Sequence, residues 1–118
     1  MTTFSRLLLS GSTSGKPIPV AATATPGTLL HTAVAGADAF DEVYLYAANV
    51  TGAAVALTVE WGGVTDPGDL LVKQYSIPAN SGPVAIAVGQ SVNGGLVVRA
   101  FAAAANAITA TGWVNRIG

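Results

Sequence analysis

A strict two-residue alternation of side-chain character constrains the fold of this chain more than any other feature. Between positions 54 and 61, every second residue is large and apolar: Val55, Leu57, Val59 and Trp61. Successive side chains of a β-strand point to opposite faces, so this period places all four residues on one buried face. Because no segment combines a 3.6-residue period with helix caps, the pattern predicts strands rather than helices.

Turn-forming residues separate the alternating segments, among them Thr25-Pro26-Gly27, Asp66-Pro67-Gly68 and Asn93-Gly94-Gly95. Turn signals about every 10 to 15 residues are typical of a sandwich or barrel. We expect one all-β domain over residues 1–118: a single antiparallel β-sandwich, jelly-roll-like, with eight or nine short strands and little or no helix. An up-and-down barrel is the alternative. The strand-like segments are Ser5–Leu9, Ile18–Ala22, Thr28–Val34, Glu42–Ala47, Ala54–Trp61, Leu70–Ile77, Pro83–Val88, Leu96–Phe101 and Ile108–Val114.

The N-terminal region contains two prolines that are two positions apart, in the sequence Lys16, Pro17, Ile18, Pro19 and Val20. Alternate residues without an N–H cannot lie in a central strand, but they suit an edge strand or an extended arm. Residues 1–30 are therefore expected to form either an arm that reaches a neighbouring copy or a plain edge strand. Under the first alternative, residues 16–20 contact a partner.

Charged residues make up only 9% of the chain, against about 25% in a typical soluble domain. Five Lys and Arg against six Asp and Glu cannot form a basic stripe along phosphates, so we expect no nucleic-acid partner. We also expect no membrane partner, because no stretch of about 18 apolar residues occurs. Charge is depleted in the cores of protein interfaces. We therefore favour a surface buried against copies or partners over a domain kept soluble by Ser, Thr, Asn and Gly.

Residue types that carry out catalysis are sparse. His31 is the only histidine, and without a clustered partner it is expected at the surface or in an interface. The segment Gly11–Lys16 imitates a phosphate-binding loop, but only three residues separate its glycines and Pro17 follows the lysine. No Gly-x-Ser-x-Gly nucleophile elbow occurs. We therefore expect no enzymatic activity and no catalytic residues.

Metal and cofactor chemistry is also not expected. The chain has no cysteine, which excludes thiolate metal sites and disulfides. Its carboxylates form two local groups, Asp38 with Asp41 and Glu42, and Asp66 with Asp69. Their spacing matches no EF-hand calcium loop. We predict no metal-binding residues and no cofactor.

Aromatic residues provide the candidate contacts. Tyr44 and Tyr46 share one strand face, opposite Val43 and Leu45. If the aliphatic residues face the core, the tyrosines face outward, where such pairs are favoured interface anchors; the reverse orientation is the alternative. Trp61 and Trp113 are expected to fill the core. The candidate interface residues are Phe4, Lys16, Pro17, Ile18, Pro19, Val20, Tyr44 and Tyr46.

Several stretches resemble a family of small structural proteins of tailed bacteriophages. They are Glu60-Trp61-Gly62-Gly63-Val64-Thr65, Pro78-Ala79-Asn80-Ser81-Gly82, the segment from Asn93 to Phe101 (NGGLVVRAF) and Gly112-Trp113-Val114-Asn115-Arg116-Ile117. The similarity covers most of the chain from about Asp41 onward, with a weaker match before it. These motifs are structural rather than catalytic.

The resemblance implies a non-enzymatic virion protein, in particular a capsid decoration or cement protein. Such a protein binds the outside of the phage head as a homo-oligomer, with a trimer favoured, and stabilises the shell by bridging subunits of the major capsid protein. The implied location is the capsid surface of the virion, after assembly in the host cytoplasm. Two alternatives remain open: a tail, neck or fibre component of the same virion, and a host-surface or carbohydrate-binding β-sandwich module.

Overall fold

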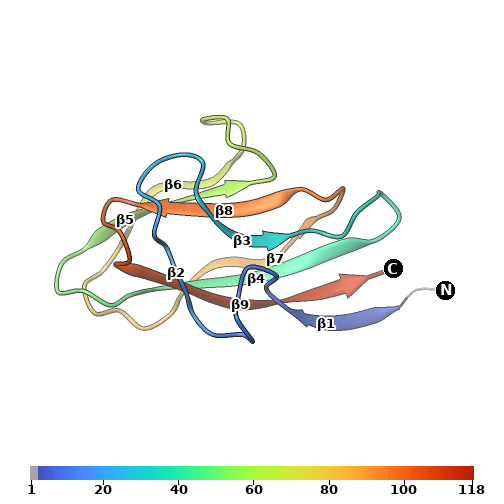
Figure 1. Ribbon diagram of the computed structural model, residues 1–118, viewed down its shortest axis with the longest axis horizontal. Helices are drawn as coiled ribbons and strands as arrows, with labels where there is room; N and C mark the ends of the chain where they lie inside the picture. The colour runs from blue at the N-terminus through green and yellow to red at the C-terminus, as the bar shows by residue number, and fades with distance from the viewer. Residues whose placement is uncertain (1–2) are drawn as a thin grey trace.

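The computed structural model describes residues 3–118, and within that range it contains nine β-strands and no helix (Figure 1). Each segment in which alternation predicted a strand overlaps one of them, so the predicted all-β fold is confirmed. The strands are β1 (Phe4–Leu8), β2 (Ile18–Pro19), β3 (Thr28–Thr32), β4 (Phe40–Asn49), β5 (Val55–Trp61), β6 (Leu70–Ile77), β7 (Val84–Val92), β8 (Val97–Ala102) and β9 (Ile108–Ile117).

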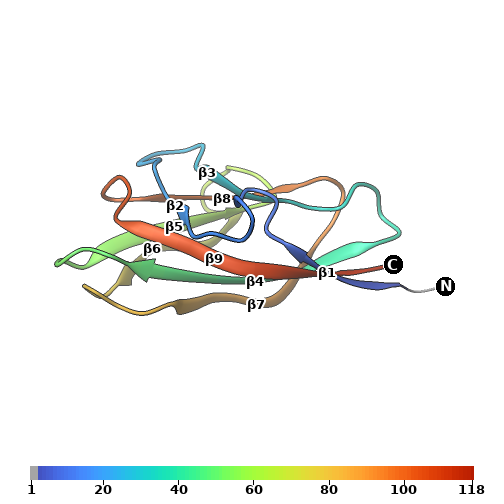
Figure 2. The same cartoon turned by 60° about the horizontal axis from the view of Figure 1, so that its bottom comes forward.

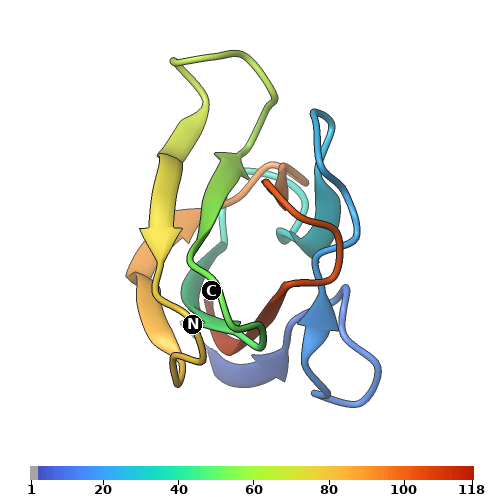
Figure 3. The same cartoon turned by 90° about the vertical axis from the view of Figure 1, so that its left-hand side faces the viewer.

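The strands form two antiparallel sheets that enclose the interior (Figure 3). Sheet A has the order β1-β9-β4-β7, with β2 also paired to β9, and sheet B has the order β3-β8-β5-β6. When β1 and β2 are counted as one interrupted strand, this is the strand order of an eight-stranded jelly roll. Among the pairs, only β5 and β6 are consecutive along the chain. An up-and-down barrel pairs consecutive strands throughout, so that alternative is wrong.

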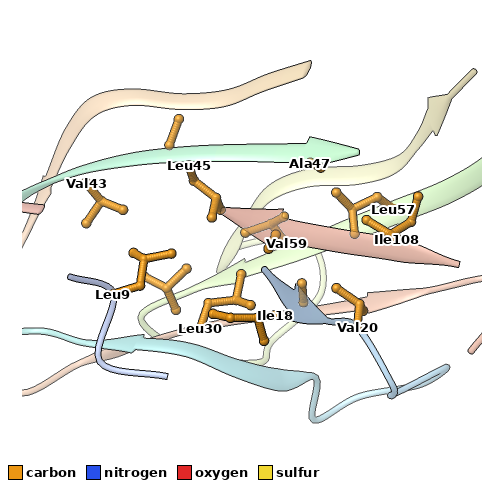
Figure 4. Packing of buried hydrophobic residues seen from close by; sticks show 14 of the residues in the cluster. Leu9, Ile18, Val20, Leu30, Val43, Leu45, Ala47, Leu57, Val59 and Ile108 are labelled. Atoms are coloured by element: carbon orange, nitrogen blue, oxygen red, sulfur yellow. The ribbon is translucent and has the colours of Figure 1, made fainter. Parts of the chain in front are cut away.

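The core lies between the two sheets (Figure 4). In β4, residues Val43, Leu45 and Ala47 are buried, whereas the residues between them are only half-buried. Sheet B contributes Leu57 and Val59 from the opposite side. Burying a Leu or Val side chain completely contributes roughly 1.5–3 kcal/mol of transfer free energy. In β4 the alternation read from the sequence therefore corresponds to the division between core and outer face, whereas in β5 Thr58 and Glu60 of the opposite face are buried as well.

The N-terminal region forms one edge of sheet A. β1 and β2 lie one after the other along β9: Phe4 is opposite Ile117, and Ile18 is opposite Ala110. Among the described residues of the 1–30 segment, β1 and β2 thus form an edge strand, which is one of the two alternatives that the sequence left open. Pro19 lies in this edge strand, and its lack of an N–H is tolerated there because an edge strand has a neighbour on one side only.

The side chains of residues 16–20 divide between core and solvent. Ile18 and Val20 are buried in the hydrophobic core of the chain itself. Lys16, Pro17 and Pro19 are exposed. The prediction that Ile18 and Val20 contact a partner is therefore wrong, because the two-residue alternation of an edge strand turns them inward.

Candidate functional site

The outer face of sheet A is the candidate interaction surface. Figure 2 shows its strands β1, β9, β4 and β7 side by side. Because Val43 and Leu45 are buried, Tyr44 and Tyr46 point away from the core, which is the first of the two orientations that the sequence left open. We call the outward side chains of this sheet the aromatic face: Phe4, Arg6, Leu8, Phe40, Glu42, Tyr44, Tyr46, Val88, Trp113, Asn115 and Ile117.

Large apolar side chains on the aromatic face are open to solvent. Phe4 is 74% exposed, Leu8 57% and Val88 63%. Scattered apolar residues are normal on protein surfaces, but a contiguous group of them marks an interaction site. The three residues come from β1 and β7, which border the aromatic cluster on its two sides.

Trp113 lies at the centre of this face. Its ring stacks on Tyr44, with centroids 4.8 Å apart and an interplanar angle of 9°, and on Tyr46 at 5.9 Å and 25°. The guanidinium carbon of Arg6 lies 4.7 Å from the Trp113 ring centroid, in a cation–π contact. The expectation that Trp113 fills the core is wrong, because alternation from the buried Val114 turns it outward. Trp61, in contrast, faces inward but is only partly buried: it packs against the core rather than filling it.

This stacking determines what the aromatic face offers to a ligand. A sugar binds to an aromatic platform by lying on a free ring face. The Trp113 ring is contacted by Arg6 from β1 and by Tyr44 from β4, the two strands on either side of β9. These contacts leave less of the Trp113 ring free for a sugar to lie on.

Three rows of outward side chains cross β1, β9 and β4 in register. They are Phe4, Ile117 and Phe40; Arg6, Asn115 and Glu42; and Leu8, Trp113 and Tyr44. Each outer row is apolar or aromatic, and the middle row has one cation and one anion on either side of an amide. A hollow of about 410 Å³ lies over the first two rows, lined by Phe4, Ser5, Arg6, Glu42, Asn115 and Ile117.

A second cluster, which the sequence did not predict, lies inside the protein at one end of sheet A. Asp41 is fully buried and its carboxylate accepts hydrogen bonds from three groups. Arg116 donates from Nε to Oδ1 at 2.7 Å and from Nη2 to Oδ2 at 3.0 Å. His31 Nε2 and the Val34 N–H also donate to Oδ2, at 2.8 and 3.1 Å. The expectation that His31 lies at the surface or in an interface is wrong, since Asp41 supplies the buried partner that it needs.

This cluster holds the carboxylate ionised. Burial alone would raise the pKa of Asp41, but the hydrogen bonds from Arg116 and His31 and the charge of Arg116 hold that pKa below its ordinary value. The hydrogen bond to Asp41 in turn raises the pKa of Arg116. The sequence contained one signal for this site: Asp41 continues the inward alternation of Val43, Leu45 and Ala47, and a carboxylate in that position requires partners.

The geometry around His31 differs from that of a catalytic triad. The Ser10 N–H donates to His31 Nδ1 at 3.1 Å, so the hydrogen of this imidazole is on Nε2 and points to Asp41. The Ser10 hydroxyl oxygen accepts a hydrogen bond from the Thr32 N–H at 2.7 Å. In a triad the second imidazole nitrogen takes a proton from the serine hydroxyl. Here that nitrogen is occupied by a backbone N–H, so the arrangement anchors residue 10 to β3.

Glu60 is a further buried carboxylate, on the outer side of sheet B. Its two oxygens accept hydrogen bonds from the Thr25 hydroxyl at 2.5 Å and from the Gly27 N–H at 2.7 Å. The adjacent cavity of about 140 Å³ also has Leu70 and Phe101 in its wall. Since both carboxylate oxygens accept hydrogen bonds from the segment that precedes β3, Glu60 holds that segment against sheet B.

The two carboxylate groups singled out in the sequence do not converge. Asp41 is turned inward to Arg116, whereas Glu42 is on the aromatic face. Asp66 pairs with Lys73 at 2.9 Å, and Asp69 accepts from the Thr65 N–H within its own loop. Within residues 3–118, no group of three or more His, Cys, Asp or Glu side chains is placed to hold a metal ion. The same residues include no helix of the length and apolarity that a membrane crossing requires.

Comparison with known proteins returned no matching family model, no matching curated protein and no matching solved structure.

Proposed function

We propose that this protein is a non-enzymatic structural component of a bacteriophage virion. Its role is that of a capsid decoration or cement protein, which binds the outside of the head and stabilises the shell by bridging capsid subunits. Its partners are the major capsid protein and further copies of itself, and its location is the capsid surface.

The observation that carries the structural role is the aromatic face. A chain with 9% charged residues presents Phe4, Leu8 and Val88 to solvent beside a stack of three aromatic rings. A contiguous group of exposed apolar and aromatic side chains marks an interaction site, and a subunit of an assembly buries such a group against its partners. Aromatic residues and arginine are the types enriched where protein interfaces are strongest.

The phage assignment rests on the resemblance of the segments around Trp61, Asn93–Phe101 and Gly112–Ile117 to small virion proteins of tailed phages. A jelly-roll sandwich is compatible with this role, since the fold recurs in viral capsid proteins. Fold alone does not define a function, so the residues of the aromatic face provide the independent support. The contacts around the Trp113 ring make the carbohydrate-binding alternative less suitable.

Immunogold labelling of intact virions of the phage that encodes this chain tests the proposal. We expect gold particles distributed over the head. As a second measurement, purified protein added to heads that lack it should co-sediment with them and raise the temperature at which they release DNA. Gold confined to the tail or neck would overturn decoration in favour of the tail, neck or fibre alternative. Absence of the protein from virions would overturn the virion role itself.

A further inference from the structure

The aromatic face has features that identify its occupant. Arg6 and Glu42 are its charged residues, one of each sign, and they lie on opposite sides of Asn115 in one row. Neither forms an ion pair with any other residue of the described part of the chain, positions 3–118. A surface with this pairing attracts neither a polyanion nor a polycation. It is complementary to a surface that presents the opposite arrangement.

We propose that the occupant is a second copy of this chain, packed face to face by a two-fold axis that lies over β9 and runs close to its direction. This inference requires only the chain itself and is independent of any role in a phage head. Rotation about such an axis keeps each row opposite the same row of the second copy and exchanges the two sides of β9. Arg6 then faces Glu42 of the second copy, and Glu42 faces its Arg6, so the symmetry forms two identical ion pairs.

The other two rows fit the same rotation. Phe4 of one copy meets Phe40 of the other, which closes the hollow of about 410 Å³ between them. Leu8 meets Tyr44 of the second copy, an apolar contact beside the Trp113 stack. Apolar side chains therefore meet apolar side chains in the two outer rows, and opposite charges meet in the middle row. An isologous interface requires this kind of self-complementarity.

The rotation opposes β1, β9 and β4 to the same three strands of the second copy, so the plane of contact is that of a small interface. Strands about 4.8 Å apart, with ten residues in β4 and β9 at about 3.4 Å each and five in β1, outline on the order of 400 Å² in plan. Side-chain relief adds to that value, and a standard interface buries about 800 Å² per partner. Sheets that pack face to face in this way keep their strand directions within about 30° of each other, so the axis is inclined only slightly to β9.

Charge reversal tests the pairing directly. Analytical ultracentrifugation of the full chain, from micromolar to millimolar concentration, should give twice the monomer mass of 11.7 kDa. Arg6→Glu places a second carboxylate against Glu42 of the other copy, and Glu42→Arg places two arginines together. Each single variant should raise the dimer dissociation constant by on the order of tenfold or more, because like charges then meet at two places. The double variant Arg6→Glu/Glu42→Arg exchanges the charges and should restore the wild-type dissociation constant.

Lys73→Glu is the matched control, since it makes the same charge change on β6 of sheet B, away from the aromatic face. It should leave the dissociation constant unchanged, and circular dichroism should confirm that all variants fold. A monomer at millimolar concentration would overturn the inference, as would a double variant that dissociates as readily as the singles. A trimer, the state implied by the resemblance to phage proteins, would also overturn it, because a three-fold axis does not pack the aromatic face of one copy against the same face of another. Each of these outcomes is measured on the isolated chain, so a failure of the dimer proposal is distinguishable from a failure of the protein to bind phage heads.

Discussion

Asp41 and Arg116, separated by 75 positions in the sequence, form a two-point ion pair between β4 and β9 with atoms 2.7 and 3.0 Å apart. They are also opposite each other in the strand register. Because His31 of sheet B donates to the same carboxylate, one aspartate links both sheets of the sandwich. Asp41 is fully buried, whereas the Arg116 side chain is one-third exposed. The pair therefore lies where the core meets solvent.

Asp41→Asn should destabilise the protein by about 3 kcal/mol, since the neutral amide no longer pairs with the charge of Arg116 and replaces one acceptor oxygen by an NH2 group that faces other donors. Urea or guanidinium unfolding measures the free energy difference. Asp38→Asn removes a carboxylate from an exposed loop position nearby and should change stability by less than about 0.5 kcal/mol. Equal effects of the two substitutions would contradict the role given to the Asp41 cluster.

The lowered pKa of Asp41 predicts an acid-dependent loss of stability. A carboxyl whose folded-state pKa is depressed binds protons more readily in the unfolded chain, so acid favours unfolding. The contribution of Asp41 is fully present above its ordinary pKa of 3.8 and is lost as the pH falls below that value, toward the folded-state pKa. The difference in unfolding free energy between wild type and Asp41→Asn should therefore shrink as the pH falls below 3.8. A difference that stays constant over this range would show that the carboxyl is not held ionised by its partners.

Gly112 is the position in β9 where a side chain is least tolerable. A Cβ there would lie 1.8 Å from the Tyr44 carbonyl oxygen of the neighbouring strand, and its φ of +156° is one that other residues rarely adopt. Gly112→Ala should thus cost about 3 kcal/mol or more, because the backbones of β4 and β9 must separate at the centre of sheet A. Gly52→Ala is the control, since a Cβ at that position meets nothing within 4 Å. Thermal unfolding of both variants compares them; similar melting temperatures would contradict the close approach.

Local pattern is sufficient to predict the strands and to reduce β4 to two orientations, of which the structure adopts the one with Tyr44 and Tyr46 outward. The alternation at Val43 and Leu45 reports burial directly, since one face of each strand is covered by the other sheet. The two-residue alternation also places Asp41, two positions before Val43, inside the protein, and it places Trp113, next to the buried Val114, on the outer face. Trp113 was expected in the core because its indole is large, and His31 at the surface because no partner was evident. Both expectations failed because the position of Trp113 and of Asp41 in the alternation decides burial here, and residue type does not.

Strand order and register were beyond the reach of the sequence. Arg6 comes near the start of the chain and Trp113 near its end, and nothing local indicates that β1 pairs with β9. The rows of the aromatic face depend on that pairing and on the register of β4 with β9. A shift of one residue would turn Tyr44 and Tyr46 into the core. The interaction surface therefore emerged only from the long-range contacts of the fold.

The stack of Tyr44 on Trp113 should contribute a measurable interaction energy in the isolated chain. With centroids 4.8 Å apart and nearly parallel planes, the pair should couple by about 1 kcal/mol beyond the area it buries. A double-mutant cycle with Tyr44→Ala, Trp113→Ala and the double variant isolates this quantity from unfolding free energies.

Tyr75→Ala supplies the control cycle with Trp113→Ala, because Tyr75 is an exposed tyrosine of β6 in sheet B. That pair should show no coupling above about 0.3 kcal/mol, as expected for residues without shared contacts. The cycles should be measured at low protein concentration, so that self-association through the aromatic face does not add to the result. Coupling of Tyr44 with Trp113 no larger than that of the control pair would contradict the stack and leave Trp113 free to present a ring face to a ligand.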